Sequence, residues 1–484
     1  MTDGASASRR DFIKGLATSA ILTGTASTTA QAKEKAQLTK KPNVILFVAD
    51  QVRWDFISAY GLNPTTRTPN LNSIAERGIA FSTAVTNQPL CSPSRACMLT
   101  GRYATETGMW KLELDLKHEL PTLASVLRQN GYTANFIGKW HLAPITPGNT
   151  QQRGFVPPED RAGFLDFWEG SNALELTSHP YSGEIWDGSG NKITFDNQYR
   201  VDFITDRAVR FLKQPQEKPF LLFISQLEPH HQNDEKRFVA PRGYAERYQN
   251  PFVPQDLLHL PGDWQQQLPD YYGAIERIDE SVGTILKTLE EQGILDNTIF
   301  LFTSDHGCHF RTRNSEYKRS AHDASIRVPF LMQGPGIDQS MGLDHVVGNR
   351  HLTPTLLDLT GTPVPPSMNG KSLVPLMRDA QARKNWPNRE LIQISESMVG
   401  RAVRTKEWTY CVADSALDGG ETPSSTHYTE YQIYNNFSDP AQQVNLAGRA
   451  QYREAANDLR AQLLELIRES GEPAPSIAPA KLYP

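Results

Sequence analysis

Residues 43–51 read Asn-Val-Ile-Leu-Phe-Val-Ala-Asp-Gln, an apolar run that ends on a carboxylate and an amide. An apolar run of this length, bounded by polar residues, predicts a strand that is buried on both faces. Four more runs of the same kind predict further buried strands, at 135–140, 219–227, 298–303 and 328–332. Buried strands of this kind are typical of a parallel sheet that is covered by helices.

Helical patterns lie between these runs, at 71–76, 121–130, 200–213 and 270–292. The last is the strongest, because its apolar residues recur on one helix face: Ile275, Ile278, Val282, Ile285, Leu286 and Leu289. Strands that alternate with helices predict an α/β fold, with a mostly parallel central sheet flanked by helices on both faces. In such sheets, functional sites form at the carboxyl ends of the strands.

The C-terminal part of the chain has a different pattern. A Pro- and Gly-rich stretch at 360–375 and a polar stretch at 378–389 precede short strand patterns at 391–434 and an amphipathic helix at 452–469. This order predicts a smaller α+β domain. We therefore expect a main domain over residues 42–380 and a small C-terminal domain over 385–475.

The composition indicates an ordered globular protein. Of the 484 residues, 38% are hydrophobic and 21% are charged, which fits neither a disordered chain nor a fibrous one. The net charge is −5 and the chain has no long basic run, so we expect no nucleic-acid partner. Four cysteines in 484 residues are too few for a disulfide scaffold, and they lack the paired C-x-x-C spacing of a zinc site.

The N-terminus resembles an export signal. Arg9 and Arg10 precede a weakly apolar stretch at 15–30, and Ala30-Gln31-Ala32 has the form of a signal-peptidase site. The stretch is shorter than the ~20 residues of a spanning helix, so we expect no stable membrane anchor. We interpret residues 1–32 as a twin-arginine signal peptide, which implies the twin-arginine export machinery as a partner and a periplasmic or secreted protein. The alternative is a disordered N-terminus with an accidental arginine pair.

The run Cys91-Ser92-Pro93-Ser94-Arg95 is followed by Thr100-Gly101-Arg102. It resembles the signature of the type I sulfatases, C-x-P-S-R before a helix and T-G-R. The resemblance implies the alkaline-phosphatase-like fold. It also implies oxidation of Cys91 to formylglycine by a formylglycine-generating enzyme. The alternative for Cys91 is a buried cysteine in a loop before a helix. We interpret Cys97 as a core residue on the helix that follows.

The chemistry of a formylglycine implies a cation nearby. A hydrated aldehyde offers one hydroxyl for attack on sulfur and a second that later expels sulfate. The ester is already anionic, so a divalent metal with hard oxygen ligands, Ca²⁺, is expected. The resemblance implies five ligands for this metal: residue 91, the pair Asp50 and Gln51, and the pair Asp305 and His306. Gln51 and His306 replace the commoner Asp and Asn, and the alternative for each of the four is a turn or helix cap.

Four motif matches assign the remaining catalytic groups. Lys139 and His141 lie in a G-K-W-H-L run. Lys139 would bind a sulfate oxygen, and His141 would act as the base in the elimination step. His230 would bind the substrate and protonate the leaving oxygen, and Lys318 matches the second sulfate-binding lysine. Arg95 would hold the diol and orient the metal site. The alternatives are hydrogen-bonded loop histidines and solvated lysines.

Two further histidines, His231 and His322, either contact the substrate or pack in the fold. The resemblance continues through 324–329, 401–404 and 434–446. The segments 144–199 and 232–270 match no motif, and loops of this kind normally determine specificity.

The sequence therefore predicts a sulfuric ester hydrolase that releases inorganic sulfate, with a sulfated carbohydrate as its substrate. One alternative is a phosphonate or phosphate monoester hydrolase with the same nucleophile. Another is a sulfated-glycan-binding protein in which Cys91 is never matured.

Overall fold

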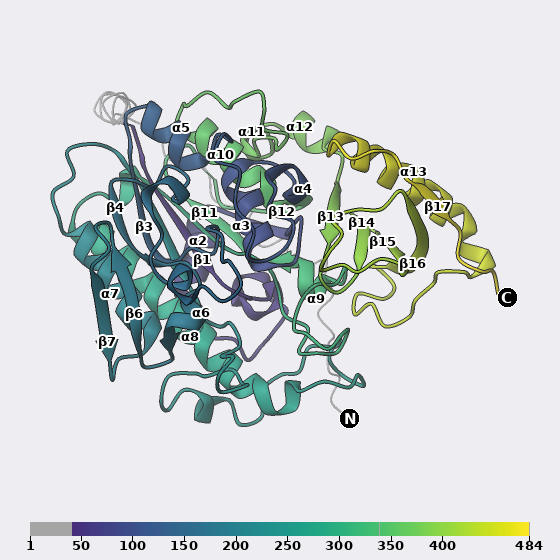
Figure 1. Ribbon diagram of the computed structural model, residues 1–484, viewed down its shortest axis with the longest axis horizontal. Coiled ribbons are helices and arrows are strands. Elements are labelled where there is room, and N and C mark those ends of the chain that lie inside the picture. Colours follow the sequence, from purple (N-terminus) through teal and green to yellow (C-terminus); the bar gives the residue numbers. More distant parts are fainter. Residues whose placement is uncertain (1–40, 338, 484) are drawn as a thin grey trace, which may run out of the picture. The chain divides into compact units, whose positions relative to one another are not determined.

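β1 (Asn43–Ala49) lies inside a 12-stranded sheet of the computed structural model, which describes residues 41–337 and 339–483 (Figure 1). It pairs in parallel with β8 (Phe220–Gln226) and β9 (Thr298–Ser304). β8 pairs in parallel with β3 (Thr133–Lys139). Every residue of β1 is buried, which confirms the prediction of an α/β fold around a central parallel sheet.

The flanks of this sheet make it mixed. On one side, β4 (Phe167–Ser171) pairs in parallel with β3 and antiparallel with β6 (Ser182–Asp187), and β6 also pairs antiparallel with β5 (Ser178–His179) and β7 (Lys192–Asp196). These added strands come from the segment 144–199, which matched no motif.

On the other side, the strand expected at 328–332 forms two pieces, β10 (Arg327–Val328) and β11 (Phe330–Gln333). Pro329 separates them, because proline has no N–H for the ladder. Both pair antiparallel with β2 (Ile79–Val85), and β11 joins β2 to β9. β12 (Met341–Gly348) pairs in parallel with β2.

The two faces of β1 pack into two cores. Val44, Leu46 and Val48 join a core with α3 (Cys91–Thr100), α5 (Leu123–Gln129) and α10 (Leu352–Leu359). Ile45, Phe47 and Ala49 join a core with α2 (Pro69–Arg77), α7 (Arg200–Leu212) and α8 (Trp264–Glu291). Alternate residues of a strand point to opposite faces, so helices cover both sides, as predicted. α8 begins at Trp264, six residues before the predicted start, and continues through Pro269.

A separate 5-stranded sheet follows, visible in green and yellow in Figure 1. Its order is β13 (Arg389–Ile394), β14 (Val399–Thr405), β15 (Trp408–Asp414), β16 (His427–Asn435) and β17 (Ser476–Ala478). α13 (Arg453–Glu469) packs Leu459, Leu463 and Leu466 against it. This confirms the smaller C-terminal α+β unit.

Five short α-helices complete the described part of the fold: α4 (Ala104–Thr107), α6 (Leu174–Thr177), α9 (Asp323–Ile326), α11 (Val374–Arg378) and α12 (Ala380–Asn385). Among residues 41–337 and 339–483, no helix combines the length and apolar character that crossing a membrane requires. The signal peptide predicted at 1–32 lies outside the described residues.

A buried carboxylate links the two sheets. Glu390 of β13 accepts hydrogen bonds from Asn87 Nδ2 (3.0 Å), Arg350 Nε (3.1 Å) and His351 Nε2 (2.7 Å). Burial alone would raise the pKa of Glu390, but the charges of Arg350 and His351, together with hydrogen bonds from His351 and Asn87, lower it from 4.5 to about 2. The ionised carboxylate therefore stabilises the fold above pH 4.5, and this contribution disappears as the pH falls toward 2.

Glu390→Gln should lose ~3–5 kcal/mol of unfolding free energy near neutral pH, because the buried guanidinium of Arg350 keeps no counter-charge. The difference from wild type should shrink in acid, where protonation removes the same charge. Urea denaturation at about pH 7 and about pH 3 measures both values.

Lys287→Ala is the matched control, since it removes one partner of an exposed pair with Glu291 at 3.8 Å. It should change stability by less than ~0.5 kcal/mol. Equal losses in the two variants would contradict the role given to Glu390.

Candidate active site

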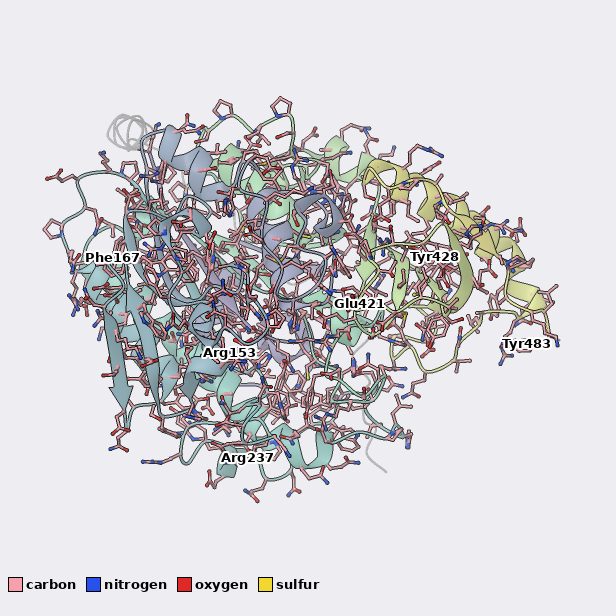
Figure 2. All side chains as sticks on the ribbon, in the orientation of Figure 1. Arg153, Phe167, Arg237, Glu421, Tyr428 and Tyr483 are labelled. Carbon is pink, nitrogen blue, oxygen red and sulfur yellow. The ribbon has the colours of Figure 1, made fainter. Side chains whose placement is uncertain are left out.

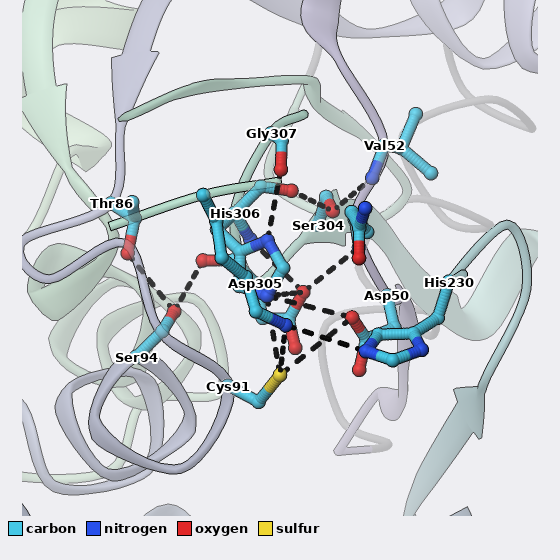
Figure 3. Close-up of polar contacts among 12 residues, drawn as sticks. Asp50, Val52, Thr86, Cys91, Ser94, His230, Ser304, Asp305, His306 and Gly307 are labelled. Carbon is cyan, nitrogen blue, oxygen red and sulfur yellow. Dashed lines mark hydrogen bonds and ion pairs between the residues drawn. The ribbon is translucent and has the colours of Figure 1, made fainter. Parts of the chain in front are cut away.

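The predicted site residues converge at the carboxyl edge of the central strands (Figure 3). Asp50 follows β1, Lys139 ends β3 and Asp305 follows β9, and all three side chains have no solvent exposure. His230 lies four residues beyond the end of β8. Neighbouring parallel strands bring their ends together, as the sequence predicted.

Cys91 is the first residue of α3 and lies at the centre of the cluster (Figure 3). Its Sγ is 2.9 Å from Lys318 Nζ, 3.2 Å from His306 Nε2 and 3.9 Å from Asp50 Oδ1. Burial alone would raise the pKa of this thiol, but the charges of Lys139, Lys318 and His306 hold it well below its ordinary value. The surroundings of residue 91 therefore stabilise negative charge.

Cys97 lies on the same helix, but the pKa of its thiol is shifted in the opposite direction. It is fully buried in α3, and burial raises the pKa of its thiol well above the ordinary value. Its position fits the prediction of a core residue on this helix.

Arg95 holds the two carboxylates of the cluster. It lies four residues after Cys91, one helical turn along α3, so both face the same way. Its Nε donates to Asp305 Oδ2 at 3.1 Å and its Nη2 to Asp50 Oδ2 at 3.4 Å. Its Nη1 donates to Ser225 Oγ at 2.7 Å, which fixes the guanidinium to β8.

Ligand atoms of Asp50, Cys91, Asp305 and His306 all lie within 4.8 Å of one another. His306 Nδ1 donates to the carbonyl of Gly307 at 3.0 Å, so in the neutral ring Nε2 carries a free lone pair. That Nε2 is 3.5 Å from Asp50 Oδ1. This tautomer makes His306 available as a metal ligand.

The electrostatics of the cluster also fit a cation. Burial and then the charge of Asp50 raise the pKa of Asp305, so the two carboxylates repel each other. Gln51 contributes its backbone N–H to Asp305 Oδ1 at 3.1 Å, while its side-chain Nε2 donates to Cys308 Sγ at 3.4 Å. Ligation by the Gln51 side chain stays a prediction.

Lys139 and His141 share a carboxylate that sequence reasoning missed. Lys139 Nζ lies 2.7 Å from Asp50 Oδ2 and 3.0 Å from Glu175 Oε1. His141 Nδ1 is 3.5 Å from the same Glu175 oxygen. Burial alone would raise the pKa of Glu175, but the charges of Lys139 and His141 lower it to about 2. Glu175 lies on α6, and the one signal that could have found it is its position four residues beyond the end of β4.

His230 and Lys318 meet on another side of Cys91. Lys318 Nζ is 3.4 Å from His230 Nε2, and His230 Nδ1 donates to the backbone oxygen of His231 at 2.7 Å. The Lys318 carbonyl accepts from His309 Nε2 at 3.0 Å, which fixes this loop. His230 thus presents Nε2 to the space beside the nucleophile.

His231 and His322 make packing contacts. The His231 ring stacks on Tyr317 with centroids 4.5 Å apart. His322 lies 3.1 Å from Ser320 Oγ and 3.2 Å from the hydroxyl of Tyr434 on β16. Burial holds the pKa of His322 well below its ordinary value. These contacts favour packing over substrate binding, especially for His322.

Comparison with known proteins agrees with this geometry. Residues 42–362 match the sulfatase family, and residues 316–469 match the family described as N-sulphoglucosamine sulphohydrolase, C-terminal. The chain therefore belongs to the sulfatase family and is a sulfuric ester hydrolase.

Similar proteins match over nearly the whole chain. An ulvan-active sulfatase of Formosa agariphila is 30% identical, over 89% of this chain and 82% of the relative. An N-acetylglucosamine-6-O-sulfatase of Bacteroides thetaiotaomicron is 25% identical, over 90% of this chain and 87% of the relative. A solved structure from work on glycosaminoglycan metabolism by the same bacterium has a TM-score of 0.76 and 23% sequence identity. The match covers 90% of this chain and 97% of the other.

Glu175→Gln should reduce kcat/KM by about 10–100-fold, because Lys139 and His141 lose the charge that holds both in place. Steady-state kinetics on nitrophenyl sulfate measure the loss, and thermal unfolding shows that the variant is folded. Glu217→Gln, at an exposed position, is the matched control and should behave as wild type. Full activity of Glu175→Gln would remove Glu175 from the site.

Proposed function

We propose that this sulfatase hydrolyses a sulfate monoester on a sulfated carbohydrate and releases inorganic sulfate, using a formylglycine derived from Cys91 and a Ca²⁺ ion. The observation that carries the proposal is the position of Cys91: a buried side chain at the start of α3, within 3.2 Å of Lys318 and His306 and beside two buried carboxylates. Charged groups gathered around one buried side chain in this way are typical of an active site.

A formylglycine at residue 91 would supply a hydrated aldehyde, with one hydroxyl for attack on sulfur and one for the later release of sulfate. The surroundings of Cys91 support this proposal. Lys318 Nζ already contacts the side chain, and its positive charge favours an ionised oxygen. The formylglycine-generating enzyme is the partner that the proposal requires.

The carboxylates of Asp50 and Asp305, with residue 91 and His306, would hold the metal. Ca²⁺ prefers oxygen ligands, and two carboxylates supply them, while the repulsion between these buried groups supports a cation at this point. The ion would supply charge neutralisation on the sulfate oxygens.

The chain's own side chains divide the remaining work. Lys139 and Lys318 would bind sulfate oxygens, since each places an ammonium group beside residue 91. His141 would take the proton in the elimination step. His230 would protonate the leaving oxygen through Nε2, because its Nδ1 is already bound to a backbone carbonyl. Arg95 would act as a positioning residue for both carboxylates.

A carbohydrate substrate and an extracytoplasmic location complete the proposal. The two relatives named above are sulfatases of ulvan and of N-acetylglucosamine-6-O-sulfate, which supports a sulfated glycan. The export signal predicted at 1–32 supports a periplasmic or secreted enzyme. Residues 42–380 and 385–475 stay as the proposed limits of the catalytic and the small domain.

Cys91→Ala should fold and bind substrate but show no multiple turnover, because it cannot form the aldehyde. The mass of the peptide that contains residue 91 in active wild-type protein should be that of an aldehyde. Sustained turnover by the variant would overturn the mechanism, and an unmodified thiol in a protein that only binds glycans would favour a binding role.

Chelation should abolish activity, and added Ca²⁺ should restore it, because Asp50 and Asp305 are hard oxygen ligands. Elemental analysis before and after chelation, together with turnover of nitrophenyl sulfate, tests this. An active preparation that contains no divalent metal would contradict the proposed site.

His230→Ala should lose ~10²–10⁴-fold more activity on a sugar sulfate than on nitrophenyl sulfate, because only the sugar alkoxide needs a proton as it leaves. His141→Ala is the paired variant: it should slow both substrates where elimination limits turnover. Comparable losses for His230→Ala on both substrates, with elimination shown not to be limiting, would mean that His230 positions the sulfate.

A further inference from the structure

A cavity of about 710 Å³ opens beside the segment that carries Glu175. Its wall combines amide, aromatic, aliphatic and cationic side chains, among them Gln151, Arg153, Phe155, Leu176 and Trp186. Figure 2 has the orientation of Figure 1, and its label for Arg153 falls in the area where Figure 1 labels α6. The catalytic scheme above uses none of these side chains.

Backbone hydrogen bonds connect the lining of the cavity to the segment that carries His141. The N–H of His141 donates to the carbonyl of Asn172 at 2.7 Å, and the N–H of Asn172 donates to the carbonyl of Gly154 at 2.9 Å. On α6, Glu175 reaches Lys139, while the next two residues, Leu176 and Thr177, line the cavity. Asn172 therefore bridges the backbone of His141 and the backbone of Gly154, which lines the cavity.

One aromatic side chain of the wall is tightly packed. Trp186 of β6 packs flat against Gly154, where a Cβ atom would lie 2.2 Å from the indole ring. Phe155 also lines the cavity, and Leu176 is 44% exposed. Sugar rings present apolar C–H faces that pack on such side chains, while their hydroxyl groups bond to amides. Gln151 and Gln152 supply amides in the same wall.

Arg153 gives the cavity an uncompensated positive charge. Its carbonyl accepts the N–H of Ala173 at 2.8 Å, and Ala173 lies two residues before Glu175. Across residues 41–337 and 339–483, no carboxylate lies within ion-pair distance of its guanidinium, and its Nε is buried without a hydrogen-bond partner. The other cation of the wall, Lys192, is paired with Glu184 at 2.9 Å.

We propose that this cavity binds a neighbouring sugar of an oligosaccharide substrate, and that Arg153 binds a second anionic group on that sugar. The inference rests on the proposed function, because the reacting sulfate ester occupies the cluster at Cys91. It identifies the substrate as a glycan of at least two sugars that carries a carboxylate or sulfate besides the ester that is cleaved. An unpaired guanidinium bonds well to either group.

The wild-type enzyme tests the inference first. Turnover is compared on nitrophenyl sulfate, on monosaccharide sulfates, and on defined di- and tetrasaccharides from ulvan and glycosaminoglycans. We expect a higher kcat/KM on an oligosaccharide whose neighbouring sugar carries a uronate or second sulfate than on the corresponding monosaccharide sulfate. Paired uronate and sulfate oligosaccharides show which anion Arg153 prefers.

Arg153→Ala tests the residue. It should raise KM by about 10–100-fold on the anionic oligosaccharides, and far less on nitrophenyl sulfate, because only the former place an anion in the cavity. Arg153→Lys should recover part of the affinity. Arg210→Ala removes an exposed arginine on α7 and should leave both substrates unchanged.

The outcomes separate the two proposals. Failure of metal-loaded, matured wild type to release sulfate from nitrophenyl sulfate and from every monosaccharide and oligosaccharide sulfate tested would count against the proposed function itself. Turnover of nitrophenyl sulfate with no preference for oligosaccharides over monosaccharides would overturn the cavity's role alone. Equal KM changes for Arg153→Ala on small and large substrates would do the same.

Discussion

The ion pairs of Arg95 with Asp50 and Asp305 are the interaction on which the site depends. The three side chains have no exposure to solvent, and two of them carry like charges in a region of low dielectric. Without the guanidinium these carboxylates could not both be buried at the ends of adjacent strands. Because Arg95 lies one turn after Cys91 on α3, the same ion pairs also fix the start of that helix beside the carboxylates.

Positive charge then extends outward from this centre. Lys139 bridges Asp50 and Glu175, while Lys318 contacts Cys91 directly. Burial removes competing water, so each of these charges acts strongly on a bound anion. The arrangement suits a sulfate ester, which is anionic before and during the reaction, and which a neutral pocket would bind weakly.

The C-terminal sheet supports the segment that leads into the nucleophile. Asn87 donates to the carbonyl of Leu391 at 2.9 Å, and Gln88 donates to Ser395 Oγ at 2.6 Å. Glu390 adds its ion pairs to Arg350 and His351 at the same junction. The small sheet therefore belongs to the catalytic architecture, because it holds residues 87 and 88 just before Cys91.

The sequence by itself determined the buried strands, the helices between them and the residues placed by local spacing. Apolar runs locate β1, β3, β8 and β9, and Asp50 and Asp305 follow β1 and β9 directly. The spacing of Cys91 and Arg95 puts both on one face of a helix. Only the tertiary structure decided that Glu175 joins Lys139, that His322 packs against Tyr434, and that Arg153 lines the cavity beside α6. These residues lie in loops or short elements without a repeating pattern, and their partners, from 20 to more than 100 residues away along the chain, meet them only when the strands pair.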